Sequence, residues 1–445
     1  MRAGEIRNRS VLVMGLGRFG GGTGVSRWLC AQGARVTVTD LADADALADS
    51  VGQLADCDVA LHLGEHQERD LDTADLVVVN PAVDRRKSPF FARIIERGIP
   101  WTTEINLFLE RCPGRVIGIT GTAGKSTTCA LLNEVLKASA TRVWFGGNVG
   151  RSLLADLPQV RPDDLVILEL SSFQLDTVSR IKPSVDTAVI TNAWPNHLDR
   201  HGDFESYLAA KLNLFRFQQA GCTAVVGPGD EALHRAVEEI AGRTGATVVL
   251  VREPREPYEL RMPGQHNQAN AACAATVSAL LGVEESAARA RMAAFGGLPH
   301  RLEHLGRFAG VDYYNDSKAT TPSGVATTLG SLDRPAIIIA GGQDRGDDLE
   351  PLVEAVNKRA KAFVCTGPSA RRLADAVISA RRDTEAPTVE VATDLADAVQ
   401  LARQHAAPGD AILLSPGAPS YGQFVNYEQR GEEFRRLVGA LSSRQ

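Results

Sequence analysis

The sequence lacks the features that would place it in a specialised class. Aromatic residues make up only 5% of its 445 residues, and its seven cysteines are scattered, with no CxxC pair and no Cys/His cluster at metal spacing. This pattern disfavours a disulfide framework and a structural zinc site, and we expect reduced thiols. No low-complexity tract interrupts the chain.

Positive charge is also in short supply. Lys and Arg number 48 against 54 Asp and Glu, which gives a net charge of -6. A nucleic acid or an anionic membrane is therefore a disfavoured partner. The apolar run after Arg9 is too short and too rich in glycine for a signal peptide or a membrane span. We expect a cytoplasmic monomer that binds small molecules, with no membrane insertion.

Strand, glycine and helix signals recur along the chain and predict an α/β protein of three domains, at residues 1–103, 104–305 and 306–445. Apolar runs predict the strands and amphipathic stretches predict the helices. The expected strands are 10–14, 35–39, 75–80, 115–120, 164–170, 186–191, 222–226, 336–340, 362–365, 389–391 and 411–414, and the expected helices are 25–32, 126–138, 204–211 and 267–281.

The strongest local signal is ITGTAGKST, residues 119–127, which follows a strand and opens a helix. In such a loop the backbone N–H groups hold phosphate oxygens, a lysine adds charge and a hydroxyl can ligate Mg²⁺. Ile119 stands where the general phosphate-loop pattern has glycine. A glycine-rich turn with a solvated lysine is the weaker alternative. We expect ATP on Gly121, Thr122, Ala123, Gly124, Lys125, Ser126 and Thr127.

A second glycine motif lies near the start of the chain. Gly15, Gly17 and Gly20 spell GxGxxG after a strand, and Asp40 closes the next strand. This is the fingerprint of a Rossmann-like dinucleotide site. Taken alone it predicts an NAD-dependent dehydrogenase, which leaves the loop at 119–127 unexplained.

The variant TGTxGKST resembles the Mur ligase and folylpolyglutamate synthase superfamily, whose members join an amine to a carboxylate through an acyl phosphate. The resemblance implies a Rossmann-like N-terminal domain, a central P-loop ATPase-like domain and a Rossmann-like C-terminal domain. Further motifs in the same order are GGNVG (146–150), LELSSFQL (168–175), TNAWPNHLDRHGDFESYLAAK (191–211), GQHNQANAACA (264–274), GLPHRLE (297–303), NDSKAT (315–320) and SYGQFVNYEQRGEEF (420–434).

The resemblance implies Mg²⁺ on Ser126, Glu169, His197 and Lys211, with Lys211 carbamylated as a ligand for a second Mg²⁺. From the residues alone, Glu169 could instead be a helix cap or a structural ion-pair partner, and His197 a surface histidine. Lys211, at the expected end of helix 204–211, could be a solvated lysine.

The remaining site residues are also implied by the resemblance. Asn267, Asn270, Arg301 and Asp316 match nucleotide-binding positions, although Asn267 could simply cap a helix. His300 either orients the incoming amine or takes its proton. Gly17, Arg18, Asp40, Asn80 and Asn148 match the UDP-substrate site, Lys125, Lys211, His300 and Lys318 the catalytic positions, and Thr320, Arg345, Ser420 and Tyr427 the amino-acid site.

The last motifs resemble those of the branch that adds D-glutamate to UDP-N-acetylmuramoyl-L-alanine during peptidoglycan precursor synthesis. That branch usually has lysine and phenylalanine where Arg345 and Tyr427 stand, so a related ligase adding another amino acid remains an alternative. Folylpolyglutamate synthases read GTNGKGS, and the diaminopimelate- or lysine-adding ligases carry DNPR, which is absent here. A non-catalytic nucleotide-binding protein would be expected to have lost some of the catalytic or metal-binding residues.

Overall fold

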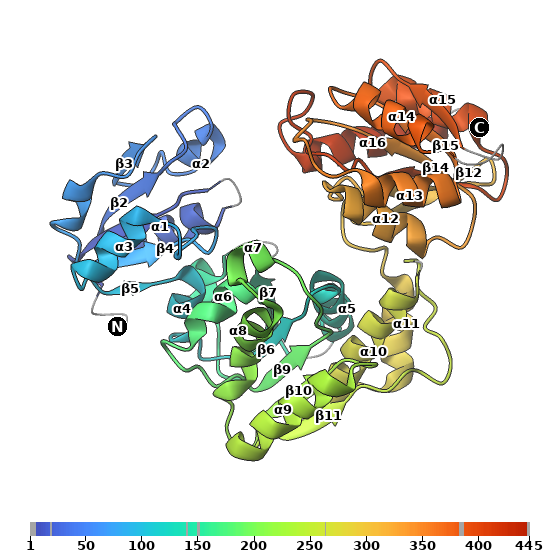
Figure 1. The fold of residues 1–445 in the computed structure, drawn as a ribbon. Helices are drawn as coiled ribbons and strands as arrows, with labels where there is room; N and C mark the ends of the chain where they lie inside the picture. Colours follow the sequence, from blue (N-terminus) through green and yellow to red (C-terminus); the bar gives the residue numbers. More distant parts are fainter. Residues whose placement is uncertain are drawn as a thin grey trace. The chain divides into compact units, whose positions relative to one another are not determined.

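Three sheets of mostly parallel strands, flanked by helices, make up the chain (Figure 1). The computed structural model describes residues 6–17, 20–138, 141–148, 152–262, 264–381 and 387–442. The chain forms two compact units, residues 1–255 with 269–288 and residues 256–268 with 289–445. The first unit contains two of the sheets and the second unit contains the third. The expected α/β class with parallel sheets is confirmed.

The first sheet has the strand order β3-β2-β1-β4-β5 and is parallel throughout. Alternate residues of its strands face opposite sides, so α1 covers one face with Val25, Trp28 and Leu29 and α3 covers the other. The elements are β1 (Ser10–Met14), α1 (Gly21–Ala31), β2 (Arg35–Asp40), α2 (Ala48–Gly52), β3 (Val59–Leu63), the 3₁₀ helix η2 (Glu68–Leu71), β4 (Leu76–Val79), α3 (Pro89–Glu96) and β5 (Trp101–Thr102).

The second sheet has the order β11-β10-β9-β6-β8-β7. Because β6 lies between β8 and β9, the loop that follows it opens beside the carboxyl ends of both neighbours. The elements are α4 (Glu104–Leu109), β6 (Arg115–Thr120), α5 (Lys125–Leu136), β7 (Val143–Gly147), η3 (Leu154–Gln159), β8 (Leu165–Glu169), α6 (Ser172–Val178), β9 (Thr187–Ile190), α7 (Leu198–His201), α8 (Phe204–Arg216), β10 (Thr223–Val226), α9 (Glu231–Thr244), β11 (Thr247–Leu250), α10 (Gln265–Leu280) and α11 (Glu285–Ala294).

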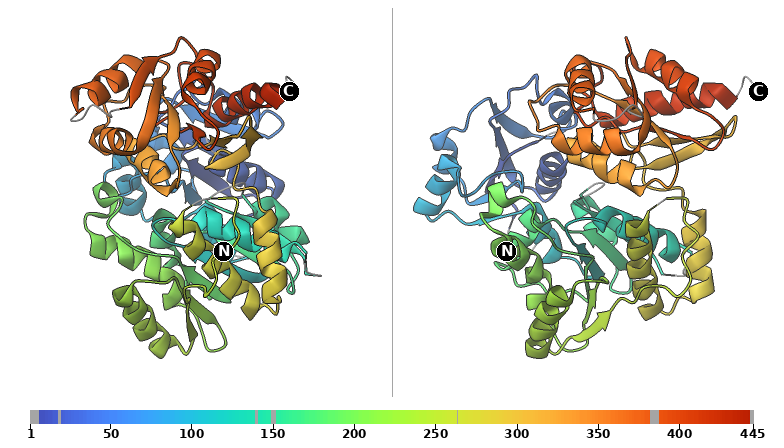
Figure 2. Two further views of the ribbon diagram at one scale, coloured as in Figure 1. Left: turned by 90° about the vertical axis from the view of Figure 1, so that its right-hand side faces the viewer. Right: turned by 45° about the vertical axis from the view of Figure 1, so that its right-hand side comes forward.

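The third sheet, in the second unit, has the order β12-β13-β17-β14-β15-β16, and only β12 is antiparallel to its neighbour. Helices α12, α13 and α14 pack on one face and α15 and α16 on the other (Figure 2). The elements are β12 (Glu303–Phe308), β13 (Val311–Asn315), α12 (Pro322–Ser331), β14 (Ala336–Ala340), α13 (Glu350–Arg359), β15 (Ala360–Cys365), α14 (Ala370–Ser379), β16 (Thr388–Val391), α15 (Leu395–His405), β17 (Ala411–Leu414) and α16 (Tyr427–Ser442).

One expected helix end and one alternative interpretation were wrong. Helix α8 does not end at Lys211 but continues to Arg216, because the following Leu212, Leu214 and Phe215 are buried and extend its apolar face. The side chain of Lys211 is consequently buried, with 1% of its surface exposed, and is not solvated. Asn267 does not cap a helix, since α10 already begins at Gln265.

No helix in the described part of the chain has both the length and the apolar character needed to cross a membrane.

Candidate active site

The loop from Gly121 to Gly124 joins β6 to α5 and is packed too tightly for side chains at its two glycines. Gly121 has φ 151°, and a Cβ there would lie 1.9 Å from Thr191 Oγ1. Gly124 has φ 80°, and its Cβ would lie 2.0 Å from Asn270 Oδ1. Both positions therefore require glycine, and the predicted residue Asn270 lies directly against the loop.

The segment that follows β9 holds this loop from the other side. Ala123 N donates to Asn192 Oδ1 at 2.9 Å, and Thr191 Oγ1 donates to Ala123 O at 2.7 Å. Thr122 Oγ1 donates to Trp194 O and accepts from Trp194 N, both at 3.2 Å. Thr191 and Asn192 lie in the TNAWP motif, which the sequence analysis quoted without assigning them a role.

Two lysine ammonium groups meet at this loop. Lys125 Nζ donates to Gly121 O at 2.9 Å and to Thr122 O at 3.0 Å, and Lys211 Nζ donates to the same Gly121 O at 2.7 Å. Lys211 Nζ also lies 4.6 Å from the centre of the Tyr207 ring. Burial and the neighbouring Lys125 charge lower the pKa of Lys211 to about 6. The amine of Lys211 is therefore largely neutral at pH 7.

Glu169 is the last residue of β8 and pairs with Ile119 of β6, so its carboxylate lies at the same sheet edge as the loop. Only 1% of its surface is exposed. Asn148 Nδ2 donates to Glu169 Oε1 at 2.9 Å. Within the described residues the buried Oε2 has no hydrogen-bond partner. A buried carboxylate oxygen of this kind is suited to a metal ion or a donor from a ligand.

His197 precedes the short helix α7 with φ 53°, and its ring centre lies 5.0 Å from that of Phe173. Burial lowers the pKa of His197 and the charge of Lys125 adds to this, while Asp199 opposes it; the net lowering favours the neutral ring, which can ligate a metal. Across the described ranges, no three His, Cys, Asp or Glu side chains are grouped to hold a metal ion. Glu169 and His197 would therefore need donors of another kind.

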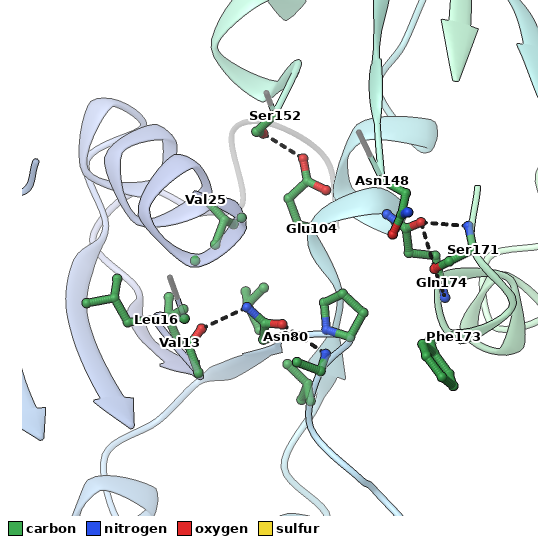
Figure 3. Close-up of a pocket in the computed structure, with 18 of the residues that line it drawn as sticks. Val13, Leu16, Val25, Asn80, Glu104, Asn148, Ser152, Ser171, Phe173 and Gln174 are labelled. Carbon is green, nitrogen blue, oxygen red and sulfur yellow. Dashed lines mark hydrogen bonds between the residues drawn. The ribbon is translucent and has the colours of Figure 1, made fainter. Parts of the chain in front are cut away.

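A pocket of about 450 Å³ opens between the two sheets of the first unit (Figure 3). Of the residues predicted for a UDP substrate, Gly17, Asn80 and Asn148 line it. Asp40 is not among the lining residues, but its Oδ2 accepts from Gly17 N at 3.0 Å and so holds the glycine loop. Arg18 lies outside the described residues.

The same pocket contains a carboxyl group that the sequence analysis did not single out. Glu104, the first residue of α4, lines the pocket, and its Oε1 accepts from Ser152 Oγ at 2.6 Å (Figure 3). Burial raises the pKa of Glu104. Its position directly after the capping residue Thr103 indicates only a helix start, so the sequence carried no signal of this placement.

In the second unit, the predicted residues His300, Lys318 and Tyr427 come together. Lys318 N donates to His300 O at 2.9 Å, and Lys318 Nζ lies 5.4 Å from the centre of the Tyr427 ring. The rings of His300 and Tyr427 are 6.0 Å apart, edge to face. One imidazole and one ammonium group thus lie beside the same aromatic ring.

Asp316 follows β13 and accepts three hydrogen bonds, from Thr328 Oγ1 at 2.7 Å, Ser415 Oγ at 2.9 Å and Leu302 N at 3.1 Å. Burial outweighs these bonds and raises the pKa of Asp316 to about 6. The bonds join β13 to α12 and to the end of β17.

The other predicted residues of this unit have fewer contacts with His300, Lys318 and Tyr427. Asn267 is buried in α10, and Ser420 is buried in the segment before α16. Thr320 N donates to Lys318 O at 3.0 Å. Burial raises the pKa of Tyr427, and the nearby charge of Arg301 partly opposes this. Arg345 is exposed, and within the described residues no hydrogen bond or ion pair joins it to the His300 cluster.

One buried arginine, Arg430, was not among the site residues predicted from the sequence. Arg430 of α16 donates to Ser317 O, Gly341 O and Ala418 O at 2.9–3.2 Å. Its guanidinium ties together the segments that follow β13, β14 and β17. Burial lowers the pKa of Arg430 to about 9. The only sequence signal was its place in the YEQRG motif.

Three parts of the chain match known Mur ligase domains: residues 9–103 match the MurD-like N-terminal domain, residues 119–251 the Mur ligase middle domain, and residues 300–417 the glutamate ligase domain. Among solved structures, the UDP-N-acetylmuramate–alanine ligase of Thermotoga maritima has a similar fold, with a TM-score of 0.60 at 18% identity over 98% of this chain and 100% of that one.

Closer relatives are known by sequence. The UDP-N-acetylmuramoylalanine–D-glutamate ligase of Symbiobacterium thermophilum is 37% identical, covering 94% of this chain and 95% of its own. The enzyme of the same name from Geobacter metallireducens is 36% identical over 99% of both chains. Identity at this level along the whole length shows common membership, so the chain belongs to the Mur ligases, in the family of the UDP-N-acetylmuramoylalanine–D-glutamate ligases.

Proposed function

We propose that the chain is an ATP-dependent ligase that adds D-glutamate to UDP-N-acetylmuramoyl-L-alanine in peptidoglycan precursor synthesis. The observation that carries the proposal is the convergence of Lys125, Lys211 and Glu169 on one phosphate-type loop. Relatives named for this reaction share 36–37% of its residues along nearly the whole chain.

The reaction proceeds in two steps. ATP held by Gly121 to Thr127 transfers its terminal phosphoryl group to the alanyl carboxylate, which forms an acyl phosphate. The amine of D-glutamate attacks the acyl carbon, and the tetrahedral intermediate expels phosphate and leaves the amide. The loop N–H groups, Lys125 and the N-terminus of α5 offset the charge that gathers on the phosphates.

The partnerless Glu169 Oε2 and the neutral amine of Lys211 fit a magnesium site. Ser126, Glu169, His197 and a carbamylated Lys211 would hold the ion, because a carbamate turns the amine into an oxygen donor and completes a set that Glu169 and His197 leave short. When bound, Mg²⁺ supplies charge that reduces repulsion between the phosphate and the carboxylate. Burial keeps Lys211 in the neutral form that reacts with carbon dioxide.

The pocket of the first unit would take the UDP-linked substrate, with Gly17, Asn80 and Asn148 along its wall and Asp40 holding the glycine loop. Arg18 is assigned to the same site on the resemblance alone. Glu104 adds a half-buried hydrogen-bond acceptor for an N–H or O–H group of this substrate.

The second unit would take the amino acid. Thr320, Arg345, Ser420 and Tyr427 are proposed to bind D-glutamate, next to the catalytic residues His300 and Lys318. Asn267, Asn270, Arg301 and Asp316 are proposed to bind ATP. Domain boundaries at 103 and 305, a monomeric state and a cytoplasmic location complete the proposal.

Phosphate release with UDP-N-acetylmuramoyl-L-alanine and ATP tests this function, with D-glutamate, L-glutamate, L-lysine and glycine compared as acceptors. We expect release with D-glutamate at least about tenfold faster than with the others, because a misplaced carboxylate leaves buried polar groups unpaired. A preference for another amino acid would reassign the substrate. No release with any of them would refute the ligase function.

A further inference from the structure

The imidazole of His300 is held on both sides. Its Nδ1 lies 3.0 Å from the side-chain amide nitrogen of Asn315, and its Nε2 lies 3.4 Å from Glu432 Oε1. The ring also packs on Gly431, where an added Cβ would come within 2.1 Å of Nδ1. The Nδ1 side of the ring therefore packs directly against the backbone of α16 at Gly431.

The orientation of the Asn315 amide is fixed by its other neighbours. Its Oδ1 accepts from Ser317 N at 3.2 Å, while its Nδ2 lies 3.2 Å from both Gly431 O and Glu303 Oε2. Turning the amide over would set its oxygen against two other oxygens and its NH₂ group against the Ser317 N–H. Asn315 is fully buried, so no water is on hand to relieve these clashes.

An amide NH₂ group donates hydrogen bonds but cannot accept them. A hydrogen on His300 Nδ1 would therefore point at a group that repels it. We infer that Asn315 is a positioning residue that holds His300 in the tautomer with its proton on Nε2, so that His300 donates a hydrogen bond and does not take the proton of the incoming amine.

The charges around the ring agree with this tautomer. Burial lowers the pKa of His300 and Arg435 adds to the effect, whereas Glu303, Glu432 and Glu428 oppose it. The charge of Glu303 is paired with that of Arg435, whose Nη2 donates to both carboxylate oxygens at 2.7 and 2.9 Å. The charged imidazolium needs a hydrogen on both nitrogens, so the contact with Asn315 disfavours it as well.

The Nε2–H group lies on the side of the ring that faces Glu432, and the ring neighbours Tyr427. Such a donor suits a carboxylate or an acyl-phosphate oxygen. This assignment of a bonding partner rests on the proposed ligase function, whereas the tautomer itself does not.

The test is a nitrogen–proton correlation spectrum of the full-length protein with ¹⁵N-labelled histidine, in which His300 is identified by the signals lost in His300→Gln. We expect a protonated Nε2 and an unprotonated Nδ1 from about pH 6 to pH 8, the range in which an ordinary histidine titrates. His62, whose Nδ1 lies 2.9 Å from Asp70 Oδ2, serves as an internal reference for the opposite tautomer. A proton on Nδ1 of His300 would overturn the inference.

A matched pair of variants tests the part played by Asn315. In Glu303→Gln the amide of Asn315 remains, and we expect the Nε2–H tautomer to remain. Adding Asn315→Asp to that variant sets an acceptor opposite Nδ1 without placing two carboxylates face to face, and we expect the proton to move to Nδ1. An unchanged tautomer in the double variant would refute the positioning role, and if that variant fails to fold the wild-type spectrum decides alone. Absence of phosphate release would refute the ligase function and leave these spectra valid.

Discussion

Lys211 and Lys125 share the carbonyl oxygen of Gly121, an arrangement that two charged ammonium groups would resist. The conflict is relieved when Lys211 gives up its proton, and burial drives its pKa in the same direction. The neutral amine is the form that adds carbon dioxide. A buried lysine beside a second lysine is thus prepared for carbamylation by its surroundings.

With ¹³C-bicarbonate, we expect a carbamate signal in the NMR spectrum of the wild-type protein and its absence in Lys211→Ala. Phosphate release by the variant should fall by about 10²-fold or more, as for loss of a group that stabilises transition-state charge, and short carboxylic acids should restore part of it. Lys137→Ala, at an exposed lysine of the same unit, should keep both signal and activity. Full activity of Lys211→Ala would rule out the role.

The same site predicts a pH dependence. The pKa of Lys211 is about 6, so its amine becomes an ammonium group as the pH falls through that value and can no longer carry a carbamate. In bicarbonate buffer, both the ¹³C signal and the rate of phosphate release should decline together below about pH 6. A carbamate signal that persists while the rate falls would assign the decline to another group.

The carboxylate of Asp316 links three parts of the fold. It accepts hydrogen bonds from α12, from the end of β17 and from the residue before β12. Its pKa is raised to about 6 from an ordinary value of 3.8. The folded state therefore holds a proton that the unfolded state releases between these two values. Stability from this group is complete below pH 3.8 and is lost as the pH rises through about 6.

Urea unfolding of the wild type and of Asp316→Asn from pH 4 to pH 7 measures this effect. The free energy of unfolding of the wild type should fall by on the order of 3 kcal/mol relative to the variant over that range, since about two pKa units are involved. Altered hydrogen bonds in Asp316→Asn would change its stability by a similar amount at every pH. They would not produce the pH-dependent difference expected from the Asp316 carboxyl group. Parallel curves would mean that Asp316 titrates normally in the folded chain.

The loop before α5 makes a further prediction at this scale. Gly124→Ala introduces a Cβ where φ is 80° and where Asn270 Oδ1 is 2.0 Å away. We expect a loss of stability of about 1–3 kcal/mol from the backbone strain and a marked loss of ATP affinity, measured by urea unfolding and calorimetry. Gly242→Ala is the control, because this glycine lies inside α9 with open space around it and should gain up to about 1 kcal/mol. Unchanged ATP affinity in Gly124→Ala would remove the loop from the site.

Most central strands were predictable from sequence and most edge strands were not; the edge strand β16 is an exception, since residues 389–391 were predicted. Residues 115–120 and 336–340 were predicted to the residue because strands β6 and β14, buried on both faces, are continuous apolar runs. The missed strands β3, β5, β7, β11 and β12 all lie at sheet edges, where half-exposed residues break the pattern. The buried strand β13 was missed because Asp312 and Asn315 interrupt its apolar residues.

The candidate site divides in the same way. Many, but not all, of the site residues in the phosphate loop and in the recognised motifs could be named from sequence, because those residues carry their chemistry at a fixed spacing. Asn192, Asn315 and Glu104 could not, because their importance comes from partners 69, 15 and 48 residues away that only the fold brings close. Long-range contacts of this kind leave no periodic trace in the sequence.

At the scale of the whole molecule, the two units are proposed to bind different substrates, and steady-state kinetics can separate them. Glu104→Gln in the first unit keeps the shape of the side chain and removes its charge. It should raise the KM for the UDP-linked substrate by about tenfold, since a hydrogen bond to a charged group contributes about 1.5–3 kcal/mol. Its KM for D-glutamate should stay close to that of the wild type.

Thr320→Ala in the second unit is the complementary variant and should raise the KM for D-glutamate alone. A rise in both KM values for either variant would show that its effect is not confined to one substrate.

The hydrogen bonds between Thr122 and Trp194 have a practical consequence. Trp194 has 48% of its surface exposed, and its backbone N–H and C=O groups both form hydrogen bonds with the Thr122 hydroxyl of the phosphate loop. The other three tryptophans, Trp28, Trp101 and Trp144, lie in α1, β5 and β7. Once those three are replaced by phenylalanine, we expect the emission of Trp194 to change when ATP binds the loop, which would report nucleotide occupancy in real time without a label.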